Sequence, residues 1–277
     1  MKSHGFLHRS LYALAGLIAV GICAAAVALL WMDRRASWTQ AYVSASNLTE
    51  VLAADIGRTI HVYDLSLQGV IERLQEPGIR DLPRATLHRF LFDRSASAEF
   101  LGTILILDSE GNVVYDSQTI EPPKANFADR DFFQVHRDSA DAGMYVSRPY
   151  RSRLRDGDES IGISRRLSNL DGSFAGVVTG SLRLAFFRER FARLSLGPQD
   201  SITILRNDGA VIARSPYSST DLGADIGQAK AFQQFLIRRD GAFVGALAPD
   251  GVERLYTFDT VPVSYTHLRA HETREDL

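Results

Sequence analysis

The sequence predicts an α+β protein with an N-terminal transmembrane helix, a long stalk helix and two modules built on antiparallel sheets. Residues 11–31 contain no charged side chain, and residues 37–75 repeat apolar side chains every three or four positions. A hairpin-like segment at Thr103 recurs at Ser201. A repeat of this length is typical of two copies of one module. Antiparallel strands joined by short turns and accompanied by helices are typical of the α+β class.

The composition limits the classes of function. The chain has 277 residues, of which 45% are hydrophobic and 23% charged, and its formal net charge is -2. This charge argues against a nucleic acid as partner. Cys23 is the only cysteine, so a disulfide framework and a cysteine-based zinc site are both excluded. We expect no cofactor and no catalytic site, because the sequence holds no Gly-rich phosphate loop and no GxSxG or GGDEF signature.

Residues 11–32 are predicted to form the transmembrane helix. The 21 residues from Leu11 to Trp31 are uncharged, and at about 1.5 Å per residue they span roughly 30 Å, the thickness of a bilayer core. A cleaved signal peptide is the alternative, but its apolar core would run only about 7–15 residues. We expect residues 1–10 in the cytoplasm and the rest of the chain outside, since long domains are translocated regardless of nearby charge.

Residues 36–100 are predicted to hold a long stalk helix and a second helix. The first runs from Ser37 to Gln75 without an internal proline, and Glu76-Pro77-Gly78 ends it. The second is expected from Arg84 to about Phe100. The apolar stripe of the first helix consists of Leu48, Leu52, Ile56, Ile60, Tyr63, Leu67, Val70 and Leu74.

Residues 101–196 and 197–263 are predicted as two copies of one module, the first being farther from the membrane. The hairpin Thr103–Ser117 recurs as Ser201–Ser215, at an offset of 98 residues. At the same offset, Gly143–Ser147 recurs as Gly241–Gly245. Further strands are expected at Gly143–Tyr150, Ser160–Leu167 and Phe174–Leu184, followed by a connecting helix at Ala185–Leu194.

Several segments together resemble the double Cache family. They are the long first helix, ILDSEGNVVYDS (Ile106–Ser117), DRDFF (Asp129–Phe133), GMYVSRPYRSR (Gly143–Arg153), ISRRLSNLDGSFAGVV (Ile163–Val178) and the second hairpin. A double Cache domain consists of two PAS-like modules strung on one long helix, and the resemblance covers roughly residues 36–263. It implies an extracytoplasmic, periplasmic small-molecule sensor of a bacterial receptor in the inner membrane, and we expect a homodimer.

The amino-acid sequences of these segments look closest to those of the sensors of diguanylate cyclases. Sensors of histidine kinases or chemoreceptors are alternatives, and so is a structural or dimerising ectodomain without a ligand. The sequence contains no output domain, so this chain itself is not expected to be an enzyme.

The last residues, 264–277, depart from the family. The resemblance implies another core strand and then a second transmembrane helix, but SYTHLRAHETREDL shows neither strand alternation nor an apolar span. This tail resembles translated adapter sequence. We expect a non-native tail, an incomplete second module and a receptor truncated before its second membrane span. A native disordered tail is the alternative.

A candidate ligand site follows from the resemblance. Amino-acid-sensing relatives place an arginine and aromatic residues at the DRDFF segment, and acids at the positions of Ser152 and Ser181. This chain keeps the arginine that can bind a ligand carboxylate and lacks the two acids that would bind an ammonium group. The expected ligand is therefore a small anion or carboxylate without an ammonium group. The predicted site residues are Arg130, Phe132, Phe133, Tyr150, Ser152 and Ser181. In the alternative interpretation both phenylalanines belong to the core, and Arg130 pairs with Asp129 or Asp131.

Two other groups of residues contain side chains that can bind ions. His267 and His271 stand at helical spacing, but no third ligand lies nearby, so no metal site is expected. A basic cluster could bind an anion, although its interruption by acids favours a solvated, salt-bridged hairpin. The cluster comprises Arg148, Arg151, Arg153, Arg155, Arg165 and Arg166.

Overall fold

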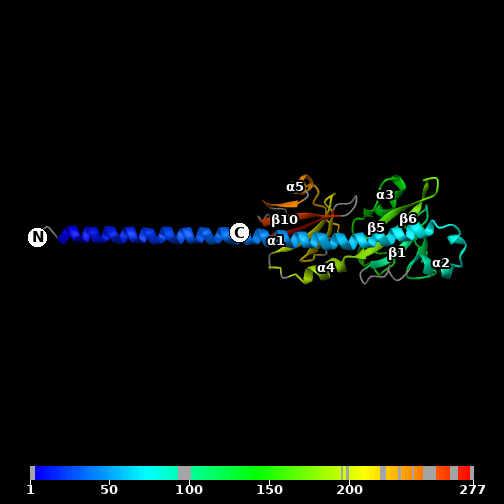
Figure 1. The fold of residues 1–277 in the computed structure, drawn as a ribbon, viewed down its shortest axis with the longest axis horizontal. Coiled ribbons are helices and arrows are strands. Elements are labelled where there is room, and N and C mark those ends of the chain that lie inside the picture. Colours follow the sequence, from blue (N-terminus) through cyan, green and yellow to red (C-terminus); the bar gives the residue numbers. More distant parts are fainter. Residues whose placement is uncertain are drawn as a thin grey trace.

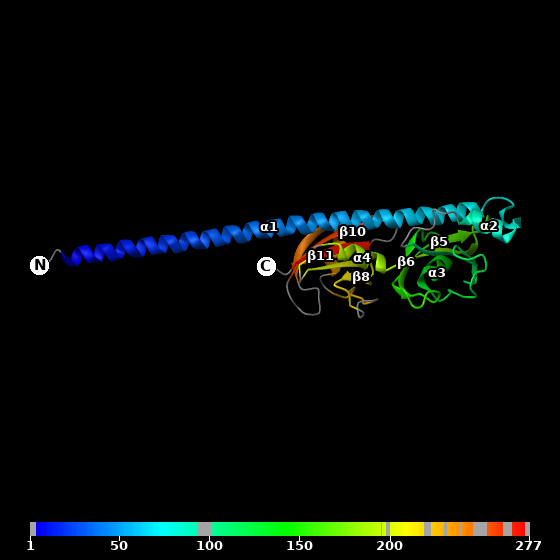
Figure 2. The same cartoon turned by 90° about the horizontal axis from the view of Figure 1, so that it is seen from below.

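The computed structural model describes residues 4–92, 101–194, 196–197, 200–218, 223–229, 232–238, 240–245, 254–262 and 268–274. One very long helix, α1 (His4–Leu74), carries two sheet modules on the same side (Figures 1 and 2). The first module lies at the end far from the N-terminus, and the second lies nearer the protruding part of α1. The predicted α+β class is confirmed.

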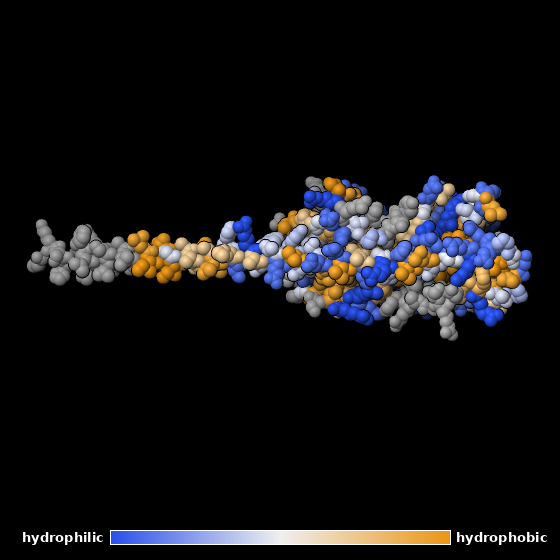
Figure 3. Space-filling view, in the orientation of Figure 1, coloured by the Kyte–Doolittle hydropathy of each residue, from blue (hydrophilic) through white to orange (hydrophobic). Residues whose placement is uncertain are grey.

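The helix α1 joins the predicted transmembrane segment and the predicted stalk in 71 residues. Among the described residues it is the one helix that is long and apolar enough to cross a membrane, judged by length and composition. Its protruding part is exposed and apolar from residue 16 to residue 32, visible as the orange band in Figure 3.

The far end of α1 is closed by two short helices, η1 (Ile79–Asp81) and α2 (Arg84–Leu91). Gly78, between α1 and η1, has a φ of 77°, which glycine adopts without steric cost. The second helix therefore begins where the sequence predicts. Its predicted continuation over residues 93–100 lies outside the described residues.

The first module is an antiparallel sheet in the order β2-β1-β6-β5-β3, with β4 also paired to β5. The helix α3 (Asp131–Asp138) packs on β5 and β6. The predicted strand at Gly143–Tyr150 is present as two short strands instead of one. The strands are β1 (Leu101–Leu107), β2 (Val113–Asp116), β3 (Tyr145–Val146), β4 (Tyr150–Arg151), β5 (Glu159–Ser168) and β6 (Phe174–Arg183).

The second module repeats this arrangement in the order β8-β7-β11-β10-β9. The helix α4 (Ala185–Ala192) connects the modules, and α5 (Phe232–Ile237) corresponds to α3. The two predicted hairpins lie in separate sheets, so the duplication is confirmed. The strands are β7 (Ser201–Arg206), β8 (Val211–Ser215), β9 (Asp240–Gly245), β10 (Arg254–Val261) and β11 (Leu268–Arg274).

The prediction of an incomplete second module is wrong. Residues 268–274 form β11, which pairs antiparallel with β10 on one side and with β7 on the other. This is the position that β6 occupies in the first sheet. A central strand obtains its backbone hydrogen bonds from both neighbours, so it can form without strong alternation of its own side chains. The non-native origin of residues 264–277 stays a prediction.

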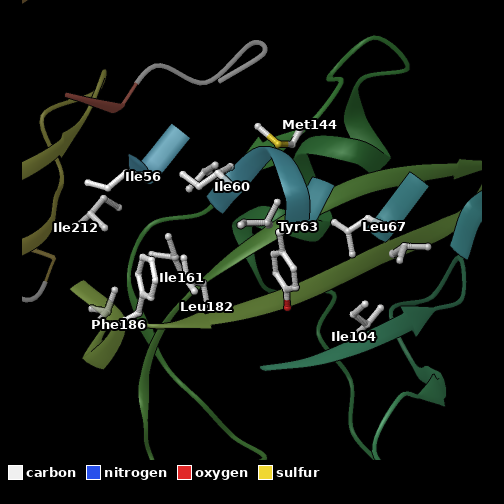
Figure 4. Packing of buried hydrophobic residues seen from close by; sticks show 14 of the residues in the cluster. Ile56, Ile60, Tyr63, Leu67, Ile104, Met144, Ile161, Leu182, Phe186 and Ile212 are labelled. Atoms are coloured by element: carbon white, nitrogen blue, oxygen red, sulfur yellow. The ribbon is translucent and has the colours of Figure 1, made fainter. Parts of the chain in front are cut away.

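One hydrophobic core joins both modules to α1. It contains the predicted stripe of the helix, including Ile56 and Ile60, each at most 1% exposed. Ile104 of β1 and Ile212 of β8 belong to the same cluster (Figure 4). Because each strand directs alternate side chains to alternate faces, one face of each sheet packs on α1.

Two adjacent residues of α1 form polar contacts with the first sheet. The Tyr63 hydroxyl donates to the backbone oxygen of Ser181 at 3.1 Å, and Figure 4 shows the ring directed from the helix toward the sheet. A Cβ at Gly180 would collide with this hydroxyl, so only glycine fits there. Arg165 of β5 donates twice to the Asp64 carboxylate, with one contact of 2.8 Å, and the Asp64 side chain is 5% exposed.

Polar contacts also connect the two modules. Arg148 forms ion pairs with Asp208 at 2.9 Å and with Asp225 at 3.3 Å. Arg206 of β7 donates to the backbone oxygen of Val146 in β3. These contacts couple the β3–β4 connection of the first module to the β7–β8 hairpin of the second.

Candidate ligand-binding site

The first module contains a partly open cavity of about 30 Å³ on the face of its sheet away from α1. Along β1, Ile104 and Ile106 face α1, whereas Thr103 and Leu105 face the cavity, as the two-residue period of a strand requires. The other face of the cavity is covered by the segment around α3. The lining residues are Thr103, Leu105, Phe127, Phe132, Tyr150, Ser152, Leu154, Arg155, Thr179 and Ser181.

The two phenylalanines of the DRDFF segment have different positions. Phe132 lines the cavity, with its ring centroid 5.7 Å from that of Tyr150 and 6.2 Å from that of Phe127. Phe133 packs against Phe174, with ring centroids 5.5 Å apart, and is absent from the lining. They stand at adjacent positions near the start of α3, so their side chains diverge by about 100°.

Arg130 lies outside the cavity lining. Its guanidinium donates to the backbone oxygen of Arg151 at 3.2 Å and its Cζ lies 5.0 Å from the centroid of the Tyr150 ring. The alternative pairings with Asp129 and Asp131 are also absent from the described contacts. Asp129 instead pairs with Arg153. Arg130 therefore braces Tyr150 from outside through a cation–π contact.

Asp131, the other acid of this segment, is held by backbone and side-chain donors. Its carboxylate accepts from the backbone N–H of Arg148 at 2.8 Å and from the Tyr145 hydroxyl at 3.2 Å. Arg206 of the second module approaches the same carboxylate at 4.0 Å. Asp131 thus ties the start of α3 to the inter-module contact, and it is not free to pair with Arg130.

The polar groups inside the cavity are hydroxyls. Tyr150, Ser152 and Ser181 lie where the sequence predicts a site, and Thr103 and Thr179 add two more hydroxyls. Burial raises the pKa of Tyr150 to about 12, although the cations of Arg130 and Arg155 oppose this shift. Tyr150 therefore remains a neutral donor. The buried Thr179 Oγ1 has no hydrogen-bond partner within the described residues.

Arg155 supplies the positive charge in this lining. The sequence places it in the basic cluster but not among the predicted site residues. The basic cluster expected to be a salt-bridged hairpin divides in the structure. Arg148, Arg153 and Arg165 pair with acids, as expected, whereas Arg155 turns inward and donates to Thr103 Oγ1. Its Nη1 is buried without a hydrogen-bond partner in the described part of the chain. In the sequence, the Asp156-Gly157 pair indicates a turn directly after Arg155, and in the structure these two residues have φ of 41° and 81°.

No metal centre is present among the described residues, which contain no group of three or more His, Cys, Asp or Glu side chains suited to an ion. The histidine pair of the tail can be judged only in part. His267 lies outside the described residues, and His271 belongs to the backbone of β11. His271 is therefore on a strand instead of a helix, so the helical spacing on which the pair was considered does not hold at His271.

Comparison with known proteins places this fold among sensor domains. A family model described as "dCache_1_like: Histidine kinase sensor domain" matches residues 185–266. No curated protein matches. The extracellular domain of rpHK1S-Z16, a protein described as a histidine kinase, has a TM-score of 0.69 and 27% identity, covering 86% of this chain and 96% of that one.

Two chemoreceptor domains have the same fold. The periplasmic sensory domain of Tlp1 from Campylobacter jejuni has a TM-score of 0.66 at 13% identity, covering 84% of this chain and 94% of that one. The ligand-binding domain of PctB from Pseudomonas aeruginosa, solved with L-Arg, has a TM-score of 0.61 at 15% identity, covering 83% and 93%. The chain thus has the fold of these extracellular and periplasmic sensor domains, and its match to a histidine kinase sensor model covers residues 185–266. The preference for diguanylate cyclases stays a prediction.

Proposed function

We propose that this chain is the membrane-anchored, extracytoplasmic sensor part of a bacterial receptor, and that its first module binds a small carboxylate or another small anion. The cavity of that module carries the proposal. Its lining combines one half-buried arginine, whose Nη1 is buried, with five hydroxyls, and no acidic side chain belongs to the lining within the described residues. Such a site can balance a negative ligand and has no group to balance a positive one.

The anchor and the arrangement of the modules support the location. The apolar part of α1 protrudes from the folded body, while both modules lie along the remainder of the helix (Figure 2). An exposed apolar surface of this length is typical of a segment that lies in a bilayer. The first module is then membrane-distal, in the periplasm. The family model favours a histidine kinase as the parent receptor over a diguanylate cyclase.

The proposal is tested by thermal unfolding of the full chain in detergent against a panel of carboxylates, amino acids, sugars and inorganic ions. A ligand that binds only the folded state, at about 100 times its Kd, stabilises it by about 2.7 kcal/mol and raises Tm. We expect carboxylates to raise Tm and neutral or cationic compounds to leave it unchanged.

Two variants locate the binding. Ser181→Leu would fill the cavity and should abolish the increase in Tm, whereas Ser173→Leu, in an exposed turn of the same sheet, should preserve it. A chain whose Tm responds to no compound would support the alternative of a structural or dimerising ectodomain. An increase in Tm that survives Ser181→Leu would place the ligand elsewhere.

A further inference from the structure

The cavity of the first module adjoins a second, wider hollow. This outer groove has a volume of about 480 Å³ and opens to solvent. Thr103, Leu154 and Arg155 line both the cavity and the groove, so these three side chains form the partition between them. The other groove residues are Asp116, Gln118, Thr119, Glu121, Pro123 and Arg183. The cavity, at about 30 Å³, is much smaller than the groove, so a ligand larger than a few atoms requires the partition to move.

Arg155 is the long and flexible member of this partition. Its Nη2 donates to Thr103 Oγ1, while its buried Nη1 lacks a partner among the described residues. A Cβ added at Gly102 would collide with both Arg155 Nη1 and Ser181 Oγ, so these two donors converge over a position that has no side chain. An unpaired buried guanidinium N–H is costly, and an anion placed beside it would remove that cost.

Asp116 lines the groove beside Arg155 but forms no hydrogen bond with it among the described contacts. Burial raises the pKa of Asp116, and the charges of Arg155 and His88 only partly offset this. The Asp116 carboxylate accepts from the backbone N–H of Gln118 at 2.8 Å. No ion pair joins Asp116 to Arg155 among the described contacts. Within the described residues, the guanidinium thus has one neutral hydrogen-bond partner, Thr103, and an unpaired Nη1 that lies near Ser181 Oγ.

We propose that Arg155 both separates the cavity from the groove and supplies the charged contact to the ligand, and that the ligand is a short-chain monocarboxylate. This inference rests on the proposed function of the same site. When Arg155 swings toward the groove, the two hollows become continuous and the ligand enters. The carboxylate then accepts from Arg155 Nη1 and the Ser181 hydroxyl, while the short apolar body contacts Phe132 and Leu105. The small cavity and the single cation argue against dicarboxylates.

The inference is tested by calorimetric titration of the full chain in detergent with acetate, propionate and pyruvate, and with propionamide as the neutral counterpart of propionate. The wild-type chain should bind propionate and discriminate against propionamide. Arg155→Met keeps most of the side-chain volume and removes the charge. It should weaken propionate binding by about ten- to a hundredfold, as expected for a hydrogen bond to a charged group, and leave propionamide binding unchanged.

Arg151→Met is the matched control, because Arg151 lies on the same hairpin with a side chain that is 67% exposed. It should bind propionate as the wild type does. Ser181→Asp is the second variant, useful if Arg155→Met does not fold. Its carboxylate would pair with Arg155 Nη1 and should abolish propionate binding.

The outcomes separate this inference from the proposed function. Equal affinity of the wild type for propionate and propionamide would overturn the inference, and so would undiminished binding of propionate by Arg155→Met. Binding of other metabolites from the panel, with none of the short carboxylates, would overturn the inference and leave the sensor proposal standing. Absence of any ligand would overturn both.

Discussion

His136 is a buried histidine within the first module. It lies on α3, is fully buried, and its Nε2 is 3.0 Å from Ser164 Oγ. Burial lowers its pKa from 6.5 to about 4, and the neighbouring charges of Arg166 and Arg165 act in the same direction. The unfolded chain therefore binds a proton that the folded chain does not bind between these two pH values. The contribution of this group to the free energy of unfolding is fully present above pH 6.5 and is lost as the pH decreases toward 4.

The loss from this group alone should reach about 3 kcal/mol at pH 4. His136→Gln cannot take up the proton, so its free energy of unfolding should depend less on pH in this window. The measurement is chemical denaturation of both proteins at a series of pH values from 7 to 4. Parallel pH profiles for the two proteins would show that His136 does not contribute this dependence.

The site residues show what could and could not be predicted at this scale. Phe132, Tyr150, Ser152 and Ser181 were predictable, because the resemblance fixes their positions along the chain and all four line one cavity. The roles of individual arginines were not, since the direction of a long side chain depends on local turns and neighbouring rings. Arg130 stacks outside on Tyr150, while Arg155 points inside.

At the scale of elements, the contact between α1 and β6 links the cavity to the stalk. Ser181 presents its side chain to the cavity and its backbone oxygen to the Tyr63 hydroxyl. A ligand that displaces β6 therefore acts on α1 through one hydrogen bond and the packing around it. We predict that signalling is mechanical and involves two chains, whose α1 helices shift against each other when the ligand binds.

This prediction is tested with cysteine pairs introduced along Ser37–Leu48, whose cross-linking between chains should change at saturating ligand. Tyr63→Phe removes only the hydroxyl and should reduce this change with little effect on affinity. Tyr42→Phe, on an exposed part of the same helix, is the control. Cross-linking that does not change when ligand is added to the wild type would refute the mechanism. An undiminished response of Tyr63→Phe would remove the hydroxyl from it.

The helices and strands were largely predictable where apolar residues recur at regular spacing in the sequence. The stripe of α1 and the two hairpins followed from spacing alone, because burial of one face imposes a periodic pattern. The strand β11 was missed, since its sequence alternates weakly and its hydrogen bonds come from β7 and β10. The interruption between β3 and β4 was also missed, although Pro149 cannot donate a backbone hydrogen bond there.

At the scale of the whole molecule, the two modules share a strand order but differ inside. The second module contains a cluster of aromatic rings, among them Phe232, Phe235 and Phe258, and the Phe235 and Phe258 centroids are 5.0 Å apart. In the described part of the second module these rings pack between the sheet and α5, whereas in the first module the cavity borders the sheet. Duplication could be predicted from the repeat, but this difference in packing could not, because it depends on how side chains of similar polarity fill a volume.

The continuity of α1 has a consequence for its angular phase. With about 3.6 residues per turn, Tyr63 and Trp31 are separated by almost nine full turns, so both point to nearly the same azimuth. A rotation of α1 about its axis at the sheets would therefore turn the transmembrane part of the helix in the same direction. One residue inserted after Ser37 should offset the phase by about 100° and alter ligand-dependent cross-linking on the N-terminal side. Seven inserted residues, about two turns, should restore it. An equal response to both insertions would mean that only axial displacement is transmitted.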